Sequence, residues 1–266
     1  MDYDLFVNEC SINAMEYFGS IVKDLTGDKP VGAFYGYLMH CARCNYAGHV
    51  GGWERVLESP YIDFVAAPKS YRRSGPGEPG GEMVPVCSVN HRKLWVDECD
   101  IRTHLATGDA ACSHSRGMAD TKVMLLREMC KNLAHGSGFW FMDLGGNWYS
   151  DAEIMRGVGE LGRVFSTAAQ KPHRRISRVI AIVDEEGVLH VQPQRNRRME
   201  HLWRNIKLCG APVDLILAQD IERMDLSDVE LAILLAPCAQ DKTYIAKVHQ
   251  NAILESISLR YNSILL

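Results

Sequence analysis

The alternation of short apolar runs with helical segments between residues 30 and 168 constrains the fold more than any other feature of this chain. The apolar runs predict four strands, at residues 30–37, Ile62–Ala67, Leu94–Val96 and Gly138–Leu144. Apolar residues at helical spacing predict helices at Ile12–Leu25, Trp53–Leu57, 117–134 and Asp151–Ala168. A repeated strand–loop–helix pattern predicts a parallel sheet with helical crossovers.

A second α/β region follows a polar, proline-bearing stretch at residues 169–175, which we interpret as a linker. Strands are predicted at Ser177–Val183, Val213–Leu217 and Val229–Ala236, with a helix near Met199–Cys209. The pattern is typical of a small doubly wound domain. No glycine-rich GxGxxG fingerprint occurs, so no dinucleotide cofactor is assigned. The expected domains are therefore 1–168 and 176–266.

Composition and charge exclude several classes of function. The 266 residues are 47% hydrophobic and 23% charged, with a net charge of −4, which argues against binding to nucleic acid or to an anionic membrane. No segment approaches the ~20 apolar residues that span a bilayer, and the acidic N-terminus does not resemble a signal peptide. Nine cysteines, an odd number, fit reduced thiols, so we expect a cytoplasmic protein.

Cys41 and Cys44 have the spacing of half a zinc site. No second close pair follows, and Cys87, His40 and His49 would complete a site only through tertiary contacts. A redox motif is the other functional interpretation of this pair. We expect neither, and predict a protein without metal or cofactor.

The segment from Leu94 to His104 carries the clearest chemical signal. Leu94–Val96 predicts a buried parallel strand, and Asp97, Glu98, Asp100 and Arg102 follow at its end. In barrels of alternating strands and helices, the carboxyl ends of strands carry the chemistry, and a carboxylate there can attack a sugar carbon or move a proton. The alternative is a solvated acidic turn that leads into the next helix.

Four pieces of the first region follow one another in a distinctive order: Ala47–His49 before Val56–Phe64, the Ser70–Arg73 loop, Leu94–His104, and Gly138–Asp143 with Gly146–Tyr149. Together they resemble the family 42 glycoside hydrolases, the bacterial β-galactosidases. Residues 176–238 resemble that family's flavodoxin-like middle domain, which is associated with trimer formation. The resemblance implies a partial (β/α)8 barrel, strands five to eight, followed by a flavodoxin-like doubly wound α/β domain of the trimerisation type, truncated at its end.

The resemblance also implies a sugar-binding site. Glu98 would be the nucleophile at the end of barrel strand seven, and Arg102 would pair with Glu98 or Asp100 and hold the nucleophile ionised. The substrate-binding residues would be Tyr37, His49, Tyr71, Arg102, Trp140 and Asp143. Core packing is the alternative role for Trp140, and a structural hydrogen bond is the alternative for His49.

One departure from the family pattern affects the expected function. The acid/base glutamate of this clan follows barrel strand four in an Asn-Glu pair, whereas the first strand here corresponds to strand five. Asn8-Glu9 follows no buried strand, so we interpret it as a coincidence. We expect a retaining β-galactosidase-type hydrolase of terminal β-galactosides, as a fragment without the acid/base half. The alternatives are a non-catalytic carbohydrate-binding or assembly remnant, with a homotrimer as the expected assembly, and a flavodoxin-like ligand-binding protein unrelated to sugars.

Overall fold

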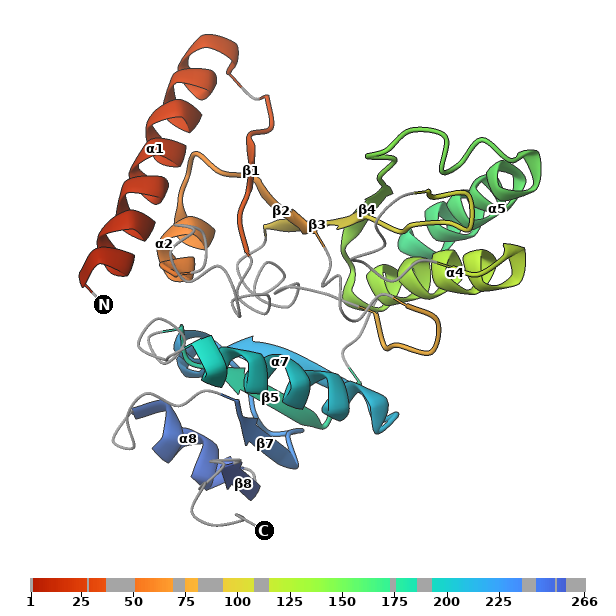
Figure 1. Ribbon diagram of the computed structural model, residues 1–266. Coiled ribbons are helices and arrows are strands. Elements are labelled where there is room, and N and C mark those ends of the chain that lie inside the picture. The colour runs from red at the N-terminus through yellow and green to blue at the C-terminus, as the bar shows by residue number, and fades with distance from the viewer. Residues whose placement is uncertain are drawn as a thin grey trace.

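Two parallel β-sheets with flanking helices make up the described part of the protein (Figure 1). The structure is a computed structural model that describes residues 2–27, 29–36, 51–68, 75–80, 93–107, 115–172, 176–185, 193–235, 243–251 and 253–256. Each sheet has four strands, and every strand pair is parallel. The predicted α/β class is therefore confirmed. None of the described helices is both long and apolar enough to span a bilayer.

The first sheet follows the order of the chain, β1-β2-β3-β4. Its strands are β1 (Gly32–Phe34), β2 (Phe64–Pro68), β3 (Leu94–Cys99) and β4 (Gly138–Phe141). Its helices are α1 (Asp2–Thr26), α2 (Trp53–Glu58), α4 (Met118–His135) and α5 (Ala152–Ala169). The helix predicted at Ile12–Leu25 begins ten residues earlier, so Asn8-Glu9 lies inside α1. Sequential parallel strands with intervening helices are consistent with part of a β/α barrel.

The two faces of the first sheet differ because successive strand residues point to opposite sides. Val65, Trp95 and Cys99 lie on the face that α1, α2, α4 and α5 cover, in two buried clusters. The opposite face carries Phe34, Phe64, Ala66, Leu94, Val96, Glu98 and Trp140, which are neighbours in the strand register. On that face Phe34 is 54% exposed and Leu94 is 49% exposed, although parallel sheets are ordinarily buried on both sides.

The first sheet is strongly curved toward this second face. Phe34 of β1 and Trp140 of β4 meet edge to face, with ring centroids 6.0 Å apart. In a flat sheet these strands would lie about 14 Å apart, three spacings of about 4.8 Å. Side chains from the two ends of the sheet therefore converge on its concave side, as they do inside a barrel.

The second sheet has the strand order β6-β5-β7-β8. Its strands are β5 (Val179–Val183), β6 (Val213–Leu217), β7 (Leu231–Leu234) and β8 (Ile253–Ser256), and β8 was not predicted. Helix α7 (Pro193–Leu208) covers one face, where Trp203 belongs to the same buried cluster as Val183 and Leu215. Helix α8 (Thr243–Asn251) and the 3-10 helix η3 (Ala218–Arg223) cover the other face. The chain enters this sheet at β5, adds β6 on one side and then β7 and β8 on the other. This order is the doubly wound arrangement.

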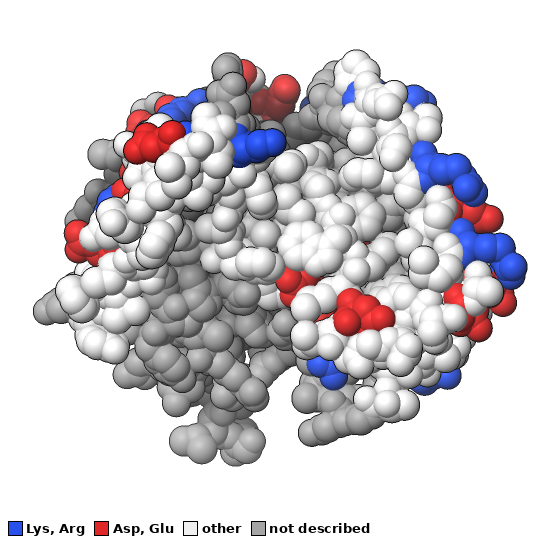
Figure 2. Space-filling view, turned by 90° about the horizontal axis from the view of Figure 1, so that it is seen from above, with Lys and Arg blue, Asp and Glu red and all other residues white. Residues whose placement is uncertain are grey.

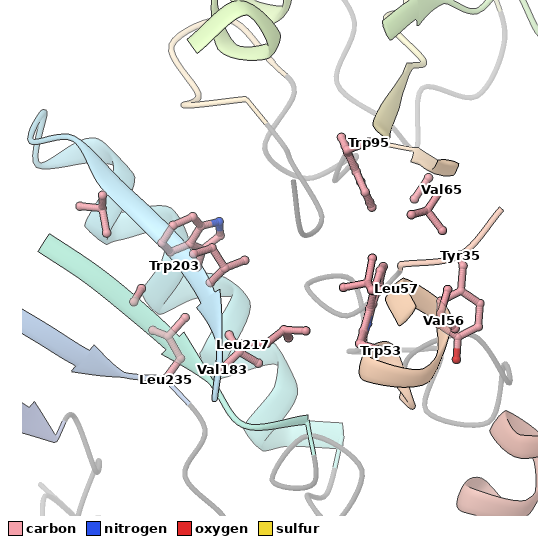
Figure 3. Close-up of a cluster of buried hydrophobic side chains, with 14 of the residues drawn as sticks. Tyr35, Trp53, Val56, Leu57, Val65, Trp95, Val183, Trp203, Leu217 and Leu235 are labelled. Atoms are coloured by element: carbon pink, nitrogen blue, oxygen red, sulfur yellow. The ribbon is translucent and has the colours of Figure 1, made fainter. Parts of the chain in front are cut away.

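One hydrophobic cluster joins the two sheets (Figure 3). Trp53 and Leu57 of α2 belong to the same buried cluster as Val183 and Leu217 of the second sheet. Polar contacts reinforce this junction: the Trp53 backbone N–H donates to Glu185 Oε2 at 3.0 Å, and Gln219 Nε2 donates to Glu185 Oε1 at 2.5 Å. The two sheets therefore share a core.

Glu185 gives this junction a pH dependence. Burial, above all, together with the charges of Asp184 and Glu54, raises its pKa from 4.5 to about 7, against its hydrogen bonds from Trp53 and Gln219. The unfolded chain releases this proton near pH 4.5 and the folded chain near pH 7, so the folded state binds more protons between these values. The contribution of Glu185 to stability is therefore fully present below pH 4.5 and lost as pH rises through 7.

We expect Glu185→Gln to remove this component. The free energy of unfolding of the variant minus that of wild type should be about 2–3 kcal/mol larger at pH 8 than at pH 5, because only wild type loses stability as Glu185 ionises. Urea unfolding at both pH values measures the difference. Glu230→Gln is the control, because Glu230 forms an exposed ion pair with Arg178 on the same domain. An equal difference between wild type and Glu185→Gln at both pH values would contradict the prediction.

Candidate active site

Glu98 lies within β3, one residue before its end, two residues beyond the strand predicted at Leu94–Val96. The register places it beside Pro68 of β2 and Trp140 of β4. Its side chain belongs to the concave face of the first sheet, and the residue is only 8% exposed. A carboxylate is thus held near the carboxyl end of a parallel strand, next to an aromatic ring.

The electrostatic surroundings of Glu98 favour its neutral form. Burial raises the pKa of Glu98, and the nearby carboxylates of Asp100 and Asp97 raise it further. The Arg102 guanidinium lies over the Trp148 ring, 5.4 Å from its centroid. The expectation that Arg102 holds Glu98 ionised therefore does not match the direction of the pKa shift.

Trp140 lies within β4, one residue before its end, and Asp143 lies two residues beyond the strand. Trp140 is half-buried on the concave face and contacts Phe34, so it lies on the same side of the sheet as Glu98. Asp143 is exposed two residues beyond the strand, where its Oδ1 accepts the Trp148 backbone N–H at 3.2 Å. Tyr37, His49 and Tyr71, like Cys41 and Cys44, lie outside the described residues. The structure therefore places Glu98 and Trp140 on the same face of the sheet. The roles of Tyr37, His49 and Tyr71 as substrate-binding residues stay predictions.

A buried ion network lies on the opposite face of β3, directly behind Glu98. Lys131 Nζ of α4 donates to Asp97 Oδ2 at 2.5 Å and to Glu128 Oε2 at 2.7 Å. Asn132 Nδ2 donates to the same Asp97 oxygen at 3.1 Å, and the Arg127 guanidinium pairs with Glu128 at 2.6 Å. Asp97 and Glu128 are fully buried. This network anchors β3 to α4.

Sequence reasoning missed this network. The detectable signal was the alternation in β3, which puts Asp97 on the same face as Trp95, together with the Glu128–Lys131 spacing on one helix face. Potential ligand atoms of Asp97, Cys99 and Glu128 lie within 4.8 Å of one another. Because Lys131 and Arg127 already pair with these carboxylates, the group is an ion network with its own cations.

The fold defines the chain as an α/β protein with two parallel sheets. Comparisons with known proteins show which solved structures resemble it. No family model and no curated protein matches the chain. Among solved structures, Gan42B, a family 42 β-galactosidase, matches with a TM-score of 0.52 and 14% identity, over 88% of this chain and 37% of that chain. A catalytic mutant of Gan42B from G. stearothermophilus matches with a TM-score of 0.47, 14% identity and the same coverage. The chain thus shares its fold with part of a β-galactosidase. It spans 37% of the length of that protein.

Proposed function

We propose that the chain carries the nucleophile half of a retaining β-galactosidase-type site, with Glu98 as the nucleophile. The observation that carries the proposal is the pairing of Glu98 with Trp140 on the concave side of a curved parallel sheet. Residues 1–168 would be the second half of the barrel, 169–175 the linker and 176–266 the flavodoxin-like domain. The fold similarity to a family 42 enzyme supports this assignment.

The proposed chemistry needs Glu98 as a carboxylate. In a retaining hydrolase the nucleophile attacks the anomeric carbon, while a second carboxyl group about 5–5.5 Å away protonates the leaving oxygen. Trp140 would offer an aromatic face to the C–H groups of the pyranose, and Asp143, Arg102, Tyr37, His49 and Tyr71 would bind its hydroxyl groups. Because the pKa of Glu98 is raised, its reactive fraction grows as pH rises through that raised value.

An activated inhibitor tests the nucleophile without requiring a proton donor. 2,4-Dinitrophenyl 2-deoxy-2-fluoro-β-galactoside has a leaving group that departs unprotonated, so a fragment without general acid help, worth ~10²–10⁴-fold, should still be labelled. We expect one fluorogalactosyl group per chain, located on Glu98 by peptide mass spectrometry. The labelling rate should increase with pH and level off above the raised pKa of Glu98.

Two variants make this experiment specific. Glu98→Gln should lose the label completely, whereas Glu230→Gln, which removes an exposed carboxylate in the second sheet, should be labelled like wild type. Labelling at a carboxylate other than Glu98 would refute the assignment. Galactose-dependent tryptophan quenching without any labelling would instead favour the non-catalytic, carbohydrate-binding alternative.

A further inference from the structure

Trp148 links the two loops that follow β3 and β4. The pairing of these strands continues by one bond beyond β4, where the Met142 N–H donates to the Cys99 carbonyl at 3.1 Å. Further along the chain, the Trp148 backbone N–H donates to Asp143 Oδ1 at 3.2 Å, and the Trp148 carbonyl accepts a hydrogen bond from the Thr103 hydroxyl. One residue of the loop after β4 therefore joins that loop to the loop after β3.

The residues on both sides of Trp148 fix its position. The Tyr149 hydroxyl donates to the Ile101 carbonyl at 3.1 Å, and the Tyr149 ring stacks on Phe141 with centroids 6.2 Å apart. Asn147 has a left-handed backbone with φ 64°, a conformation that asparagine adopts more readily than most residues. Trp148 itself is buried. The turn before Trp148 and the contacts after it thus determine where its ring lies.

The Trp148 ring contacts both loops. The Arg102 guanidinium, from the loop after β3, lies over the ring, and a cation–π contact of this kind contributes about 0.5–2 kcal/mol. On the loop after β4, a Cβ added at Gly145 would lie 2.7 Å from the indole Nε1. No ordinary contact is that short, so a side chain at Gly145 would force the ring to move.

Arg102 differs from the charged side chains at the surface. In Figure 2, acidic and basic side chains lie next to one another along the outer sides of the molecule, where water and salt screen them. Exposed ion pairs, such as that of Lys122 with Glu153, do little to fix a side chain. Arg102 is half-buried instead, with its guanidinium over an aromatic ring. Its position therefore depends on that ring.

We propose that Trp148 is a positioning residue, which holds Arg102 and Asp143 at the separation that a galactoside requires. The role rests on the proposed function, in which both side chains bind hydroxyl groups of the sugar. The two come from different loops, and each contacts Trp148, Arg102 through the ring and Asp143 through the backbone N–H. Glu98 depends less on Trp148, because Glu98 lies within β3 and pairs with Trp140 in the strand register.

The kinetics of inactivation by 2,4-dinitrophenyl 2-deoxy-2-fluoro-β-galactoside test this role, because they separate binding from attack. In Trp148→Ala the inhibitor concentration that gives half the maximal rate should rise by roughly tenfold or more, as for the loss of one hydrogen bond to a charged group. The maximal rate, which reports attack by Glu98, should change by less than about threefold, since an interaction that serves binding alone leaves the chemical step unchanged.

A second variant and two controls make the result specific to the position of the ring. Gly145→Ala retains every side chain of the site but displaces the Trp148 ring, so it should weaken binding as Trp148→Ala does. Gly157→Ala makes the same substitution in α5, where a Cβ would meet nothing within 4 Å, and should be inactivated like wild type. Trp148→Phe keeps a ring beside Arg102, so its binding should stay within about threefold of wild type.

A double-mutant cycle decides whether Trp148 acts through Arg102. Arg102→Ala should weaken binding less in the Trp148→Ala background than in wild type, because the guanidinium is already misplaced there. Additive effects would overturn the positioning role, and so would unchanged binding in Trp148→Ala and Gly145→Ala, or equal losses in binding and maximal rate. Far-UV circular dichroism checks folding, and Gly145→Ala decides if Trp148→Ala is unfolded. An unlabelled wild type would refute the assignment of Glu98 and this role together, whereas a labelled wild type with unchanged variants would overturn this role alone.

Discussion

Replacing Lys131 with methionine is expected to destabilise the protein by about 3–5 kcal/mol, the typical cost of removing one partner from a buried ion pair. The Lys131 ammonium bridges Asp97 and Glu128, and all three side chains are buried. Methionine preserves most of the apolar length of lysine but not its charge, so two carboxylates would remain close together in a medium that solvates them poorly. Urea unfolding measures the loss.

The expected loss depends on pH. Burial raises the pKa of Asp97, and Glu128 raises it too, whereas Lys131 and Asn132 oppose them. Without Lys131 these carboxyl groups can avoid their charge by binding protons, so Lys131→Met should be less destabilising at pH 5 than at pH 8. Adding Asp97→Asn to Lys131→Met should recover part of the loss, because it removes the carboxylate charge that Lys131 compensated, whereas Glu128 keeps its ion pair with Arg127.

The control for this prediction lies on the same helix. Lys122 of α4 forms an ion pair with Glu153, and both side chains are about half exposed. Lys122→Met should therefore cost roughly 0–1 kcal/mol and show little dependence on pH. A loss for Lys131→Met no larger than for Lys122→Met would mean that the buried network is not needed for stability.

Strand and helix positions could be predicted well where the apolar pattern is unbroken. The strand predicted at Val213–Leu217 is β6 residue for residue, and the helix predicted at 117–134 is α4 shifted by one. β3 was predicted too short, because Asp97 and Glu98 interrupt the apolar pattern although the strand continues through them. Their polar groups remain compatible with a buried strand since Asp97 is paired on one face and Glu98 lies at the concave side.

Tertiary relationships could be predicted only in part. The carboxyl end of β3 as a candidate site follows from local pattern and strand direction. The ion network behind Glu98 depends on α4 packing so that Lys131 reaches Asp97, 34 residues away, which one sequence does not specify. The raised pKa of Glu98 has the same origin, because it depends on burial and on how Asp97 and Asp100 are placed around it.

The junction between the two sheets was not visible in the sequence at all. The polar stretch at 169–175 predicts a linker between two domains, but it does not reveal that Trp53 of α2 belongs to a buried cluster that reaches Val183 and Leu217. Alternation identifies the buried residues of each sheet, but not which buried surface meets which. From the sequence, Trp53 is predicted only as the first residue of a short helix.

Truncation of that residue should affect both sheets. Trp53 is fully buried and packs edge to face on Tyr35, with ring centroids 5.3 Å apart, and against Trp95 at 6.3 Å. Trp53→Ala would remove these contacts and leave a cavity, so we expect a loss of about 3–5 kcal/mol in unfolding free energy. Because one core serves both sheets, backbone amides of β2 and of β5 should exchange with deuterium faster in the variant, as measured by peptide mass spectrometry.

Trp53→Phe tests whether the loss grows with the volume that is removed. The indole N–H of Trp53 makes no hydrogen bond within the described part of the chain, and the bond to Glu185 comes from the backbone. Phenylalanine therefore removes less volume than alanine and breaks no hydrogen bond of the described residues, so we expect it to cost clearly less than alanine while leaving the exchange of β5 near wild type. Faster exchange in β2 with an unchanged β5 in Trp53→Ala would show that the second sheet is stable without Trp53, and would contradict a core shared between the two sheets.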